Sequence, residues 1–98
     1  MNSLMFDRNC NELKLGDKVV LIASGQEGKI VFECGAFGIG IDGCINYDKI
    51  QNTMDEIGIG NKYEGCFNDN FVTLWELYWN FNGDEEILEF VEILERGE

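Results

Sequence analysis

The chain has 98 residues, with 19 acidic and 7 basic side chains, and its net charge is −12. This length suits a single domain, residues 1–98, built around one modest hydrophobic core. The excess of acidic residues argues against direct nucleic-acid binding, because the phosphates would be repelled. The apolar runs are too short to cross a bilayer, so we expect no membrane insertion.

The first residues and the cysteines indicate a cytoplasmic protein. Residues 1–18 contain neither the basic stretch nor the apolar stretch of a secretory signal. The four cysteines, at positions 10, 34, 44 and 66, form no C-x-x-C pair, and the chain has no histidine. This pattern excludes most zinc sites and predicts free thiols that pack as small buried hydrophobes. A disulfide between two of them is the alternative.

Two strands are predicted in the first half of the chain. Residues 18–23 are mostly apolar and β-branched, and the glycines within residues 24–28 predict a turn after them. Residues 29–34 form the second predicted strand, with Ile30 and Phe32 on one face.

Glycine dominates the next segment. Gly35 interrupts the second strand, and residues 37–41 continue it, with glycine at every second position. This alternation suits tight curvature or the close approach of another backbone. Asp42 and Gly43 then form a dipeptide that is typical of a hairpin turn. Residues 38–43 also match G-x-G-x-x-G, but the chain is too short and too rich in strands for a dinucleotide-binding unit.

A short helix is predicted over residues 46–57, followed by a loop over residues 58–70. Asn46 is suited to cap the start of this helix, and Gly58 is suited to end it. The apolar residues recur at helical spacings of three and four, at Tyr47, Ile50, Met54 and Ile57.

The pattern of residues 71–81 fits two structures. Their apolar residues recur at period two, which favours a strand, and Asn82-Gly83 follows as a hairpin signal. On such a strand, Trp75 and Trp79 share a face and Tyr78 points the other way. The polar residues Thr73, Glu76 and Asn80 also share one face of a helix, which is the alternative. Residues 87–94 are predicted as a further strand, or alternatively as a helix capped by Asp84.

These elements predict a mainly β fold. We expect a small SH3-like barrel or a strongly bent antiparallel sheet, with at most one or two short helices.

Two segments carry a resemblance to a known family. Residues 6–20 resemble the opening of small SH3-like barrels, in which a D-x-x-G-x-E-[apolar]-x-x-G-D-x-V turn leads into the first strand. Residues 27–39 are similar to the second and third strands of the YopX-like proteins of phages and prophages of low-GC bacteria, and residues 74–77 and 88–94 match their closing strands more loosely. Cys10 or Asn11 stands where the family usually has glycine, and the middle of the chain has no counterpart. The resemblance implies an SH3-like fold and a phage origin, with no catalytic residues to carry over.

No set of residues indicates an active site. A cysteine or serine nucleophile usually needs a histidine base, which this chain lacks. Oxygen ligands for a hard cation occur close together, but without the spacing of an EF-hand, so a solvated acidic turn is the preferred interpretation. These ligands are Asn80, Asn82, Asp84, Glu85 and Glu86. We therefore expect no catalytic residues, no cofactor and no metal.

The distribution of charge predicts the function. Between residues 64 and 98 there are ten acidic residues and one basic residue, together with both tryptophans. We expect a non-enzymatic interaction protein that binds a basic surface of a protein partner. In its sharpest form it mimics nucleic acid and inhibits a host defence nuclease, such as a CRISPR effector. The expected partner-binding residues are Glu76, Tyr78, Glu85, Glu86, Glu89, Glu92 and Glu95.

Two other functions remain open at this point. The first is a small-ligand-binding or sponge protein, with a mouth lined by Gly38 and Gly40 and with Tyr47 or Tyr63 stacking on the ligand. The second is a phage structural component that assembles with copies of itself. The sequence does not predict the oligomeric state.

Overall fold

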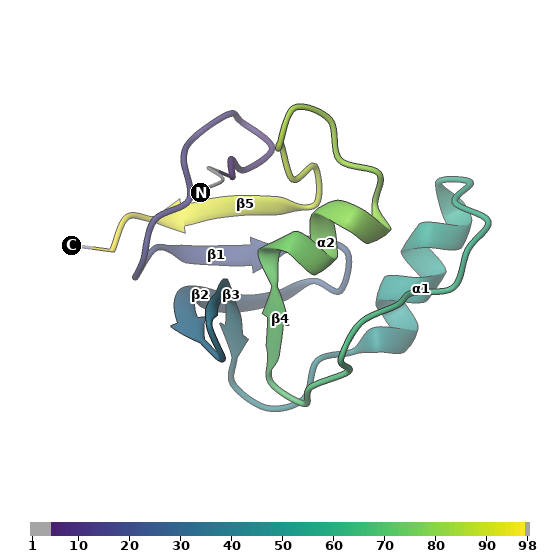
Figure 1. Cartoon of the computed structure of the whole chain (residues 1–98), viewed down its shortest axis with the longest axis horizontal. Coiled ribbons are helices and arrows are strands. Elements are labelled where there is room, and N and C mark those ends of the chain that lie inside the picture. Colours follow the sequence, from purple (N-terminus) through teal and green to yellow (C-terminus); the bar gives the residue numbers. More distant parts are fainter. Residues whose placement is uncertain (1–4, 98) are drawn as a thin grey trace.

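The computed structural model describes residues 5–97, which form five strands and two short helices (Figure 1). Within this range, no helix is long and apolar enough to cross a membrane. In chain order the elements are β1 (Lys18–Leu21), β2 (Gln26–Glu33), β3 (Ala36–Ile41), α1 (Tyr47–Glu56), β4 (Phe71–Thr73), α2 (Leu74–Asn80) and β5 (Val91–Glu95).

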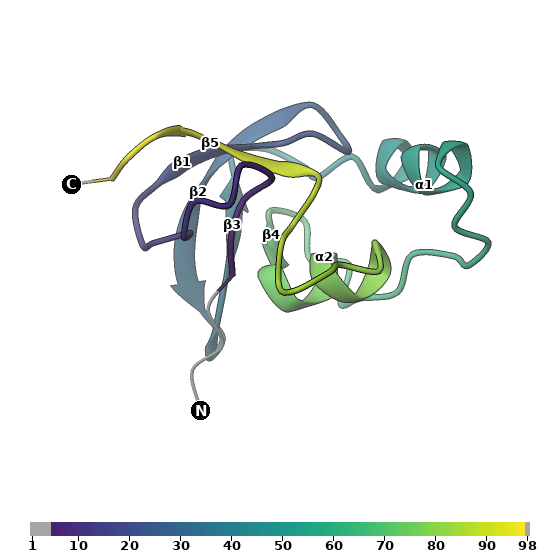
Figure 2. The same ribbon diagram turned by 90° about the horizontal axis from the view of Figure 1, so that it is seen from above.

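The strands form one antiparallel sheet in the order β4-β3-β2-β1-β5. The last strand therefore pairs with the first, and the sheet bends around a single core (Figure 2). Helix α2 lies between β4 and β5 in the chain and contacts β3 and β4. The prediction of a mainly β fold with a small, bent sheet and two short helices is confirmed.

The glycine at position 35 reverses the chain rather than interrupting one strand. Cys34 and Gly35 both have positive φ angles, 54° and 80°, and together form a two-residue turn between β2 and β3. Such turns match the right-handed twist of the paired strands. Asp42 and Gly43, by contrast, do not form the predicted hairpin, since β3 next pairs with β4, far along the chain.

Alternate strand residues point into the core. Val19 and Leu21 of β1 and Ile30 of β2 are fully buried, as is Ile39, which pairs with Ile30 across β2 and β3. Gly38 lies on the opposite face, where the ring of Phe71 packs directly on its backbone. A side chain at position 38 would collide with that ring, which explains the glycine there.

Helix α1 begins and ends where the sequence predicted. The Asn46 side chain accepts a hydrogen bond from the Lys49 backbone N–H (3.0 Å), and Gly58 follows the helix with a φ angle of 93°. Ile50 and Met54, four residues apart, are fully buried in the core. The hydroxyl of Thr53 donates to the carbonyl of Ala23 (2.8 Å), which ties the helix to the turn after β1.

The predicted strand over residues 71–81 is wrong after Thr73. The Thr73 side chain accepts from the Glu76 backbone N–H (3.0 Å), which caps the first turn of α2. Leu74 and Leu77 of this helix are buried, so the core takes its apolar residues at helical spacing. The following residues return to a strand in β5, and the alternative of a C-terminal helix is also wrong.

The cysteines are free, as predicted, but all four are exposed rather than buried. The physical reason is their position in turns and loops. Cys10 and Cys34 have positive φ angles of 65° and 54°, and Cys44 and Cys66 lie outside the helices and strands. A turn backbone that reverses at the surface leaves its side chain in solvent.

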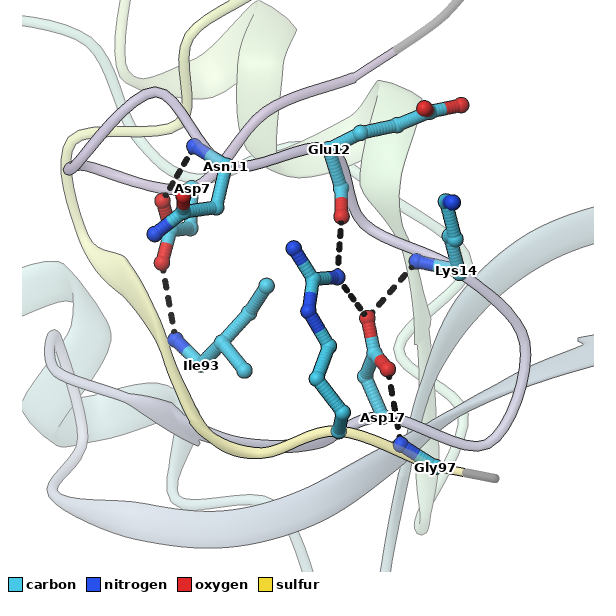
Figure 3. Close-up of polar contacts among 8 residues, drawn as sticks. Asp7, Asn11, Glu12, Lys14, Asp17, Ile93 and Gly97 are labelled. Atoms are coloured by element: carbon cyan, nitrogen blue, oxygen red, sulfur yellow. Dashed lines mark hydrogen bonds and ion pairs between the residues drawn. The ribbon is translucent and has the colours of Figure 1, made fainter.

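Two buried aspartates fasten the N-terminal segment to the end of the chain (Figure 3). Asp7 accepts hydrogen bonds from the backbone N–H groups of Asn9, Asn11 and Ile93, each at 2.9 Å. The Arg8 backbone N–H donates to the carbonyl of Val91 (2.9 Å). These bonds occupy polar groups on the outer edge of β5, which would otherwise be open to another strand.

Asp17 performs the same role at the far end of β5. Its carboxylate accepts from the backbone N–H groups of Lys14 and Gly97 and from the Arg96 guanidinium, each at 2.9 Å. Burial alone would raise the pKa of Asp17, but the bonds from Gly97 and Lys14 and the charge of Arg96 outweigh it and lower the pKa.

Replacing Asp17 with asparagine should lower the free energy of unfolding by about 2–4 kcal/mol at neutral pH, because Arg96 loses its ion pair and one acceptor oxygen is lost. The lowered pKa means that Asp17 stabilises the fold above its ordinary pKa of 3.8 and that this contribution is lost as the pH falls through the folded-state value. Urea unfolding at several pH values should therefore show the two proteins converging in acid. Asp42→Asn, at an exposed position, is the matched control. If the free energies of unfolding of the two proteins differ by the same amount throughout the acid range, this role of Asp17 is contradicted.

Candidate functional site

Three aromatic side chains lie close together on α2, two of them exposed and the third, Tyr78, half-buried against the core. Trp75 is 51% exposed and Trp79 is 67% exposed, while the rings of Trp75 and Tyr78 stack at 5.2 Å with an angle of 16°. Residues spaced three and four apart share a face of a helix. The prediction that Tyr78 points away from the tryptophans is therefore wrong, because it assumed a strand.

The end of α2 holds Tyr78 in place. Asn82 has a positive φ angle of 51°, and the Gly83 backbone N–H donates to the carbonyl of Tyr78 (2.9 Å). This is the helix-ending pattern that asparagine and glycine favour. The Tyr78 ring packs against Gly83 so closely that a Cβ at position 83 would collide with the ring. The predicted hairpin signal at Asn82-Gly83 is thus a helix end.

A groove runs beside this end of the helix, with a volume of about 350 Å³. Tyr78 and Trp79 line one side of it, and Lys62 and Glu64 belong to the loop on the other. The side chain of Asn80 joins the two sides. It accepts from the Glu64 backbone N–H (2.8 Å) and donates to the Glu64 carbonyl (2.7 Å).

Glu76 faces the opposite way, into a cluster of tyrosines. The hydroxyl of Tyr63 donates a short hydrogen bond to its carboxylate, and the ring of Tyr63 lies 5.4 Å from that of Tyr47. Burial, assisted by Glu76, raises the pKa of Tyr63 far above its ordinary value. Burial, with the charges of Glu76 and Asp69, raises the pKa of Tyr47 to about 12. Glu76 therefore has an internal partner, whereas the other predicted partner-binding acids do not share this cluster.

Glu85 and Glu86 form a turn with an unusual backbone. Their φ angles are 50° and 65°, and the Ile87 backbone N–H donates to the carbonyl of Asp84 (2.9 Å). Two positive φ angles in succession normally require asparagine and glycine. Each costs a side-chain-bearing residue roughly 1–2 kcal/mol. The turn therefore carries two acids at a place where the backbone disfavours them.

Glu92 and Glu95 share the outer face of β5 because of an irregularity in its pairing. Glu92 is paired with Val20 and Glu95 with Lys18, and the register shifts by one residue between these pairs, at Leu94. Without this bulge, two residues spaced three apart would point to opposite faces. Glu89 is exposed in the turn before β5.

A second groove, of about 540 Å³, lies over the outer face of β2 and β3. It is lined by Gly28 and Gly40 together with Lys18, Glu27, Lys29 and Asp42. The ligand-binding mouth that the sequence predicted between Gly38, Gly40 and the tyrosines does not form. Gly38 is covered by Phe71, and the rings of Tyr47 and Tyr63 pack against each other at a tilt and contact Phe67 edge-on.

Among residues 5–97, no group of three or more acidic or cysteine side chains is placed to hold a metal ion. Asn80, one of the oxygen ligands considered from the sequence, is buried, and its amide is occupied by Glu64 and by the carbonyl of Glu76.

The sequence interpretation missed the shared face of the aromatic residues and the role of Glu64. A signal for the first was present. Thr73 followed three residues later by Glu76 is the spacing of a helix-capping box and predicts a helix starting at residue 74. The position of Glu64 depends on a hydrogen bond across 16 residues, which no local pattern reveals.

Comparison of this chain with models of protein families, with curated proteins and with solved structures finds no match.

Replacing Tyr63 with phenylalanine should lower the free energy of unfolding by about 1–2 kcal/mol at neutral pH, because Glu76 loses its donor. Above pH 10 the difference in the free energy of unfolding between the parent protein and the variant should become smaller. A folded-state pKa above the ordinary 10.0 gives stability that is full below that pH and is lost as the pH rises through the folded value. Unfolding measured from neutral to alkaline pH tests this. If the free energy of unfolding of the variant falls as steeply with rising pH as that of the parent protein, this role of Tyr63 is contradicted.

Proposed function

We propose that this protein is a non-enzymatic, acidic interaction protein that binds a basic surface of another protein. The observation that carries this proposal is the pair of exposed tryptophans on α2, Trp75 and Trp79, together with the half-buried Tyr78 that stacks on Trp75. Tryptophan and tyrosine are the residues that most often dominate the binding energy of protein interfaces. Two tryptophans more than half exposed contribute little to the core, so a partner is the economical explanation for them.

The charge distribution supports a basic partner. Nine of the twelve net negative charges belong to residues 64–98, the segment that also contains α2 and β5. A field of one sign attracts an oppositely charged surface over several ångströms and speeds association, and salt weakens this effect. Binding should therefore be fast and sensitive to ionic strength.

In its sharpest form, the protein mimics the charge of nucleic acid and blocks a nucleic-acid-binding enzyme, such as a host defence nuclease. The shared outer face of Glu92 and Glu95 supports this form, as does the exposure of Glu85 and Glu89 nearby in sequence. The resemblance of residues 27–39 to YopX-like proteins supports a phage origin, and a phage gains from inhibiting such nucleases.

The test is a pull-down from the lysate of a low-GC bacterium, washed at low and at high salt. A nucleic-acid-binding protein should be retained at low salt and released at high salt. The double variant Glu89→Lys/Glu92→Lys should lower the affinity for that protein by about tenfold or more, through like-charge repulsion. Trp75→Ala/Trp79→Ala should lower it by a similar factor, through loss of contact area.

The matched control changes the same charge elsewhere. Asp55→Lys/Glu56→Lys reverses two exposed acids at the end of α1, away from α2 and β5, and should change the affinity little. If both charge-reversed proteins lose binding equally, only total charge matters and the proposed surface is wrong. A partner indifferent to salt would contradict the acidic interaction itself.

The strained turn offers a separate test. Glu85→Asn/Glu86→Gly gives both positive φ positions the residues that suit them, so the free energy of unfolding should rise by about 1–2 kcal/mol. The same variant should bind the partner more weakly, since two acids are lost. Thermal unfolding and an affinity measurement on one preparation check both effects. Higher stability with unchanged affinity would show that this turn does not belong to the binding surface.

A further inference from the structure

The groove at the end of α2 combines an aromatic wall with a carboxylate. Trp79 and Tyr78 contribute rings, and Glu64 contributes the acid from the facing loop. Its volume of about 350 Å³ is at the small end of ligand sites, which span roughly 300–1,000 Å³. The groove is therefore sized for one or two side chains of a partner.

Two side chains of this groove, Asn80 and Tyr78, are held in position before any partner arrives. Asn80 is only 7% exposed, and its amide makes three hydrogen bonds, two with the Glu64 backbone and one to the carbonyl of Glu76. Tyr78 is held between the stacked ring of Trp75 and the backbone of Gly83. A preorganised site loses less entropy on binding than a mobile one.

We propose that this groove anchors an arginine side chain of the basic partner, an inference that rests on the protein-binding function proposed above. A guanidinium is flat and weakly hydrated, so it stacks on the exposed indole of Trp79 while its N–H groups reach a carboxylate. Glu64 supplies that carboxylate, and the net charge of −12 favours a cation over a neutral or anionic group. A lysine ammonium is a strongly hydrated point charge and gains less from the same ring.

Lys62 lines the same groove, and its charge should act on a bound arginine in the opposite way to the charge of Glu64. Its positive charge repels an incoming guanidinium, whereas the carboxylate of Glu64 attracts one. Removing each charge should therefore move the affinity in opposite directions.

The experiment is an NMR titration with three short peptides in a glycine–serine background, which carry arginine, lysine or citrulline at the same positions. The indole N–H signals of Trp75 and Trp79 report separately and are assigned with the Trp75→Leu and Trp79→Leu variants. The arginine peptide should shift mainly the Trp79 signal and should bind about three- to fivefold more tightly than the lysine peptide. The neutral citrulline peptide should shift it little.

Matched variants locate the site. Glu64→Gln should weaken the arginine peptide about threefold more than Glu56→Gln, which removes the same charge from the exposed end of α1, and Lys62→Gln should tighten binding. Equal effects of Glu64→Gln and Glu56→Gln, or equal binding of the arginine and lysine peptides, would overturn the arginine site. The proposed function would then be judged separately, since the salt-sensitive partner and the Glu89→Lys/Glu92→Lys variant do not depend on this groove.

Discussion

Asp7 and Asp17, two buried side chains, join the beginning of this chain to its end through hydrogen bonds. Asp7 binds the backbone of Ile93, 86 residues away, and Asp17 binds Arg96 and Gly97. A domain of this size buries only a modest core, so each contact that fixes β5 against β1 matters. The same bonds occupy backbone groups on the edge of β5, which leaves fewer of them there for another strand to pair with. The position of β5, and of the glutamates that it carries, depends on these two carboxylates.

Helix α2 is the second organising element, because one face serves the core and the other faces solvent. Leu74 and Leu77 pack inside, whereas Trp75 and Trp79 are exposed. The acids of the C-terminal third likewise divide into two kinds. Glu76 is bound to Tyr63, whereas Glu85 and Glu89 are exposed. A high negative charge therefore does not make every acid available to a partner, and the candidate surface is smaller than the charge alone suggests.

The proposed surface combines features that cost stability. Exposed indoles forgo burial, and two glutamates occupy backbone positions that favour asparagine and glycine. Residues that break local rules without a compensating contact are expected to concentrate at functional sites. Several such residues fall in one continuous segment, from Trp75 to Glu86, next to the groove that Asn80 and Glu64 hold together, and others, such as Cys34, lie in turns elsewhere.

Local patterns in the sequence were enough for most of the elements. The β1 and β2 strands follow from β-branched residues bounded by glycine, and α1 follows from its spacing together with Asn46 and Gly58. Residues 37–41 were predicted as a continuation of β2 and instead belong to the separate strand β3. Residues 71–81 were mispredicted because their apolar side chains satisfy both periods. The Thr73 cap and the burial of Leu74 and Leu77 against β3 and β4 select the helix.

Charge, the number of thiols and most of the secondary structure are properties of neighbouring residues, so they can be read along the chain. Which acids are exposed, which thiols are exposed and which aromatic residues share a face are not. The sequence alone would place Asp7 and Asp17 at the surface, but both are buried because the last residues of the chain pack against them. Glu92 and Glu95 share a face only because pairing with β1 forces a bulge at Leu94. These outcomes depend on contacts between residues far apart in the chain, and such contacts form only when the sheet closes around its core.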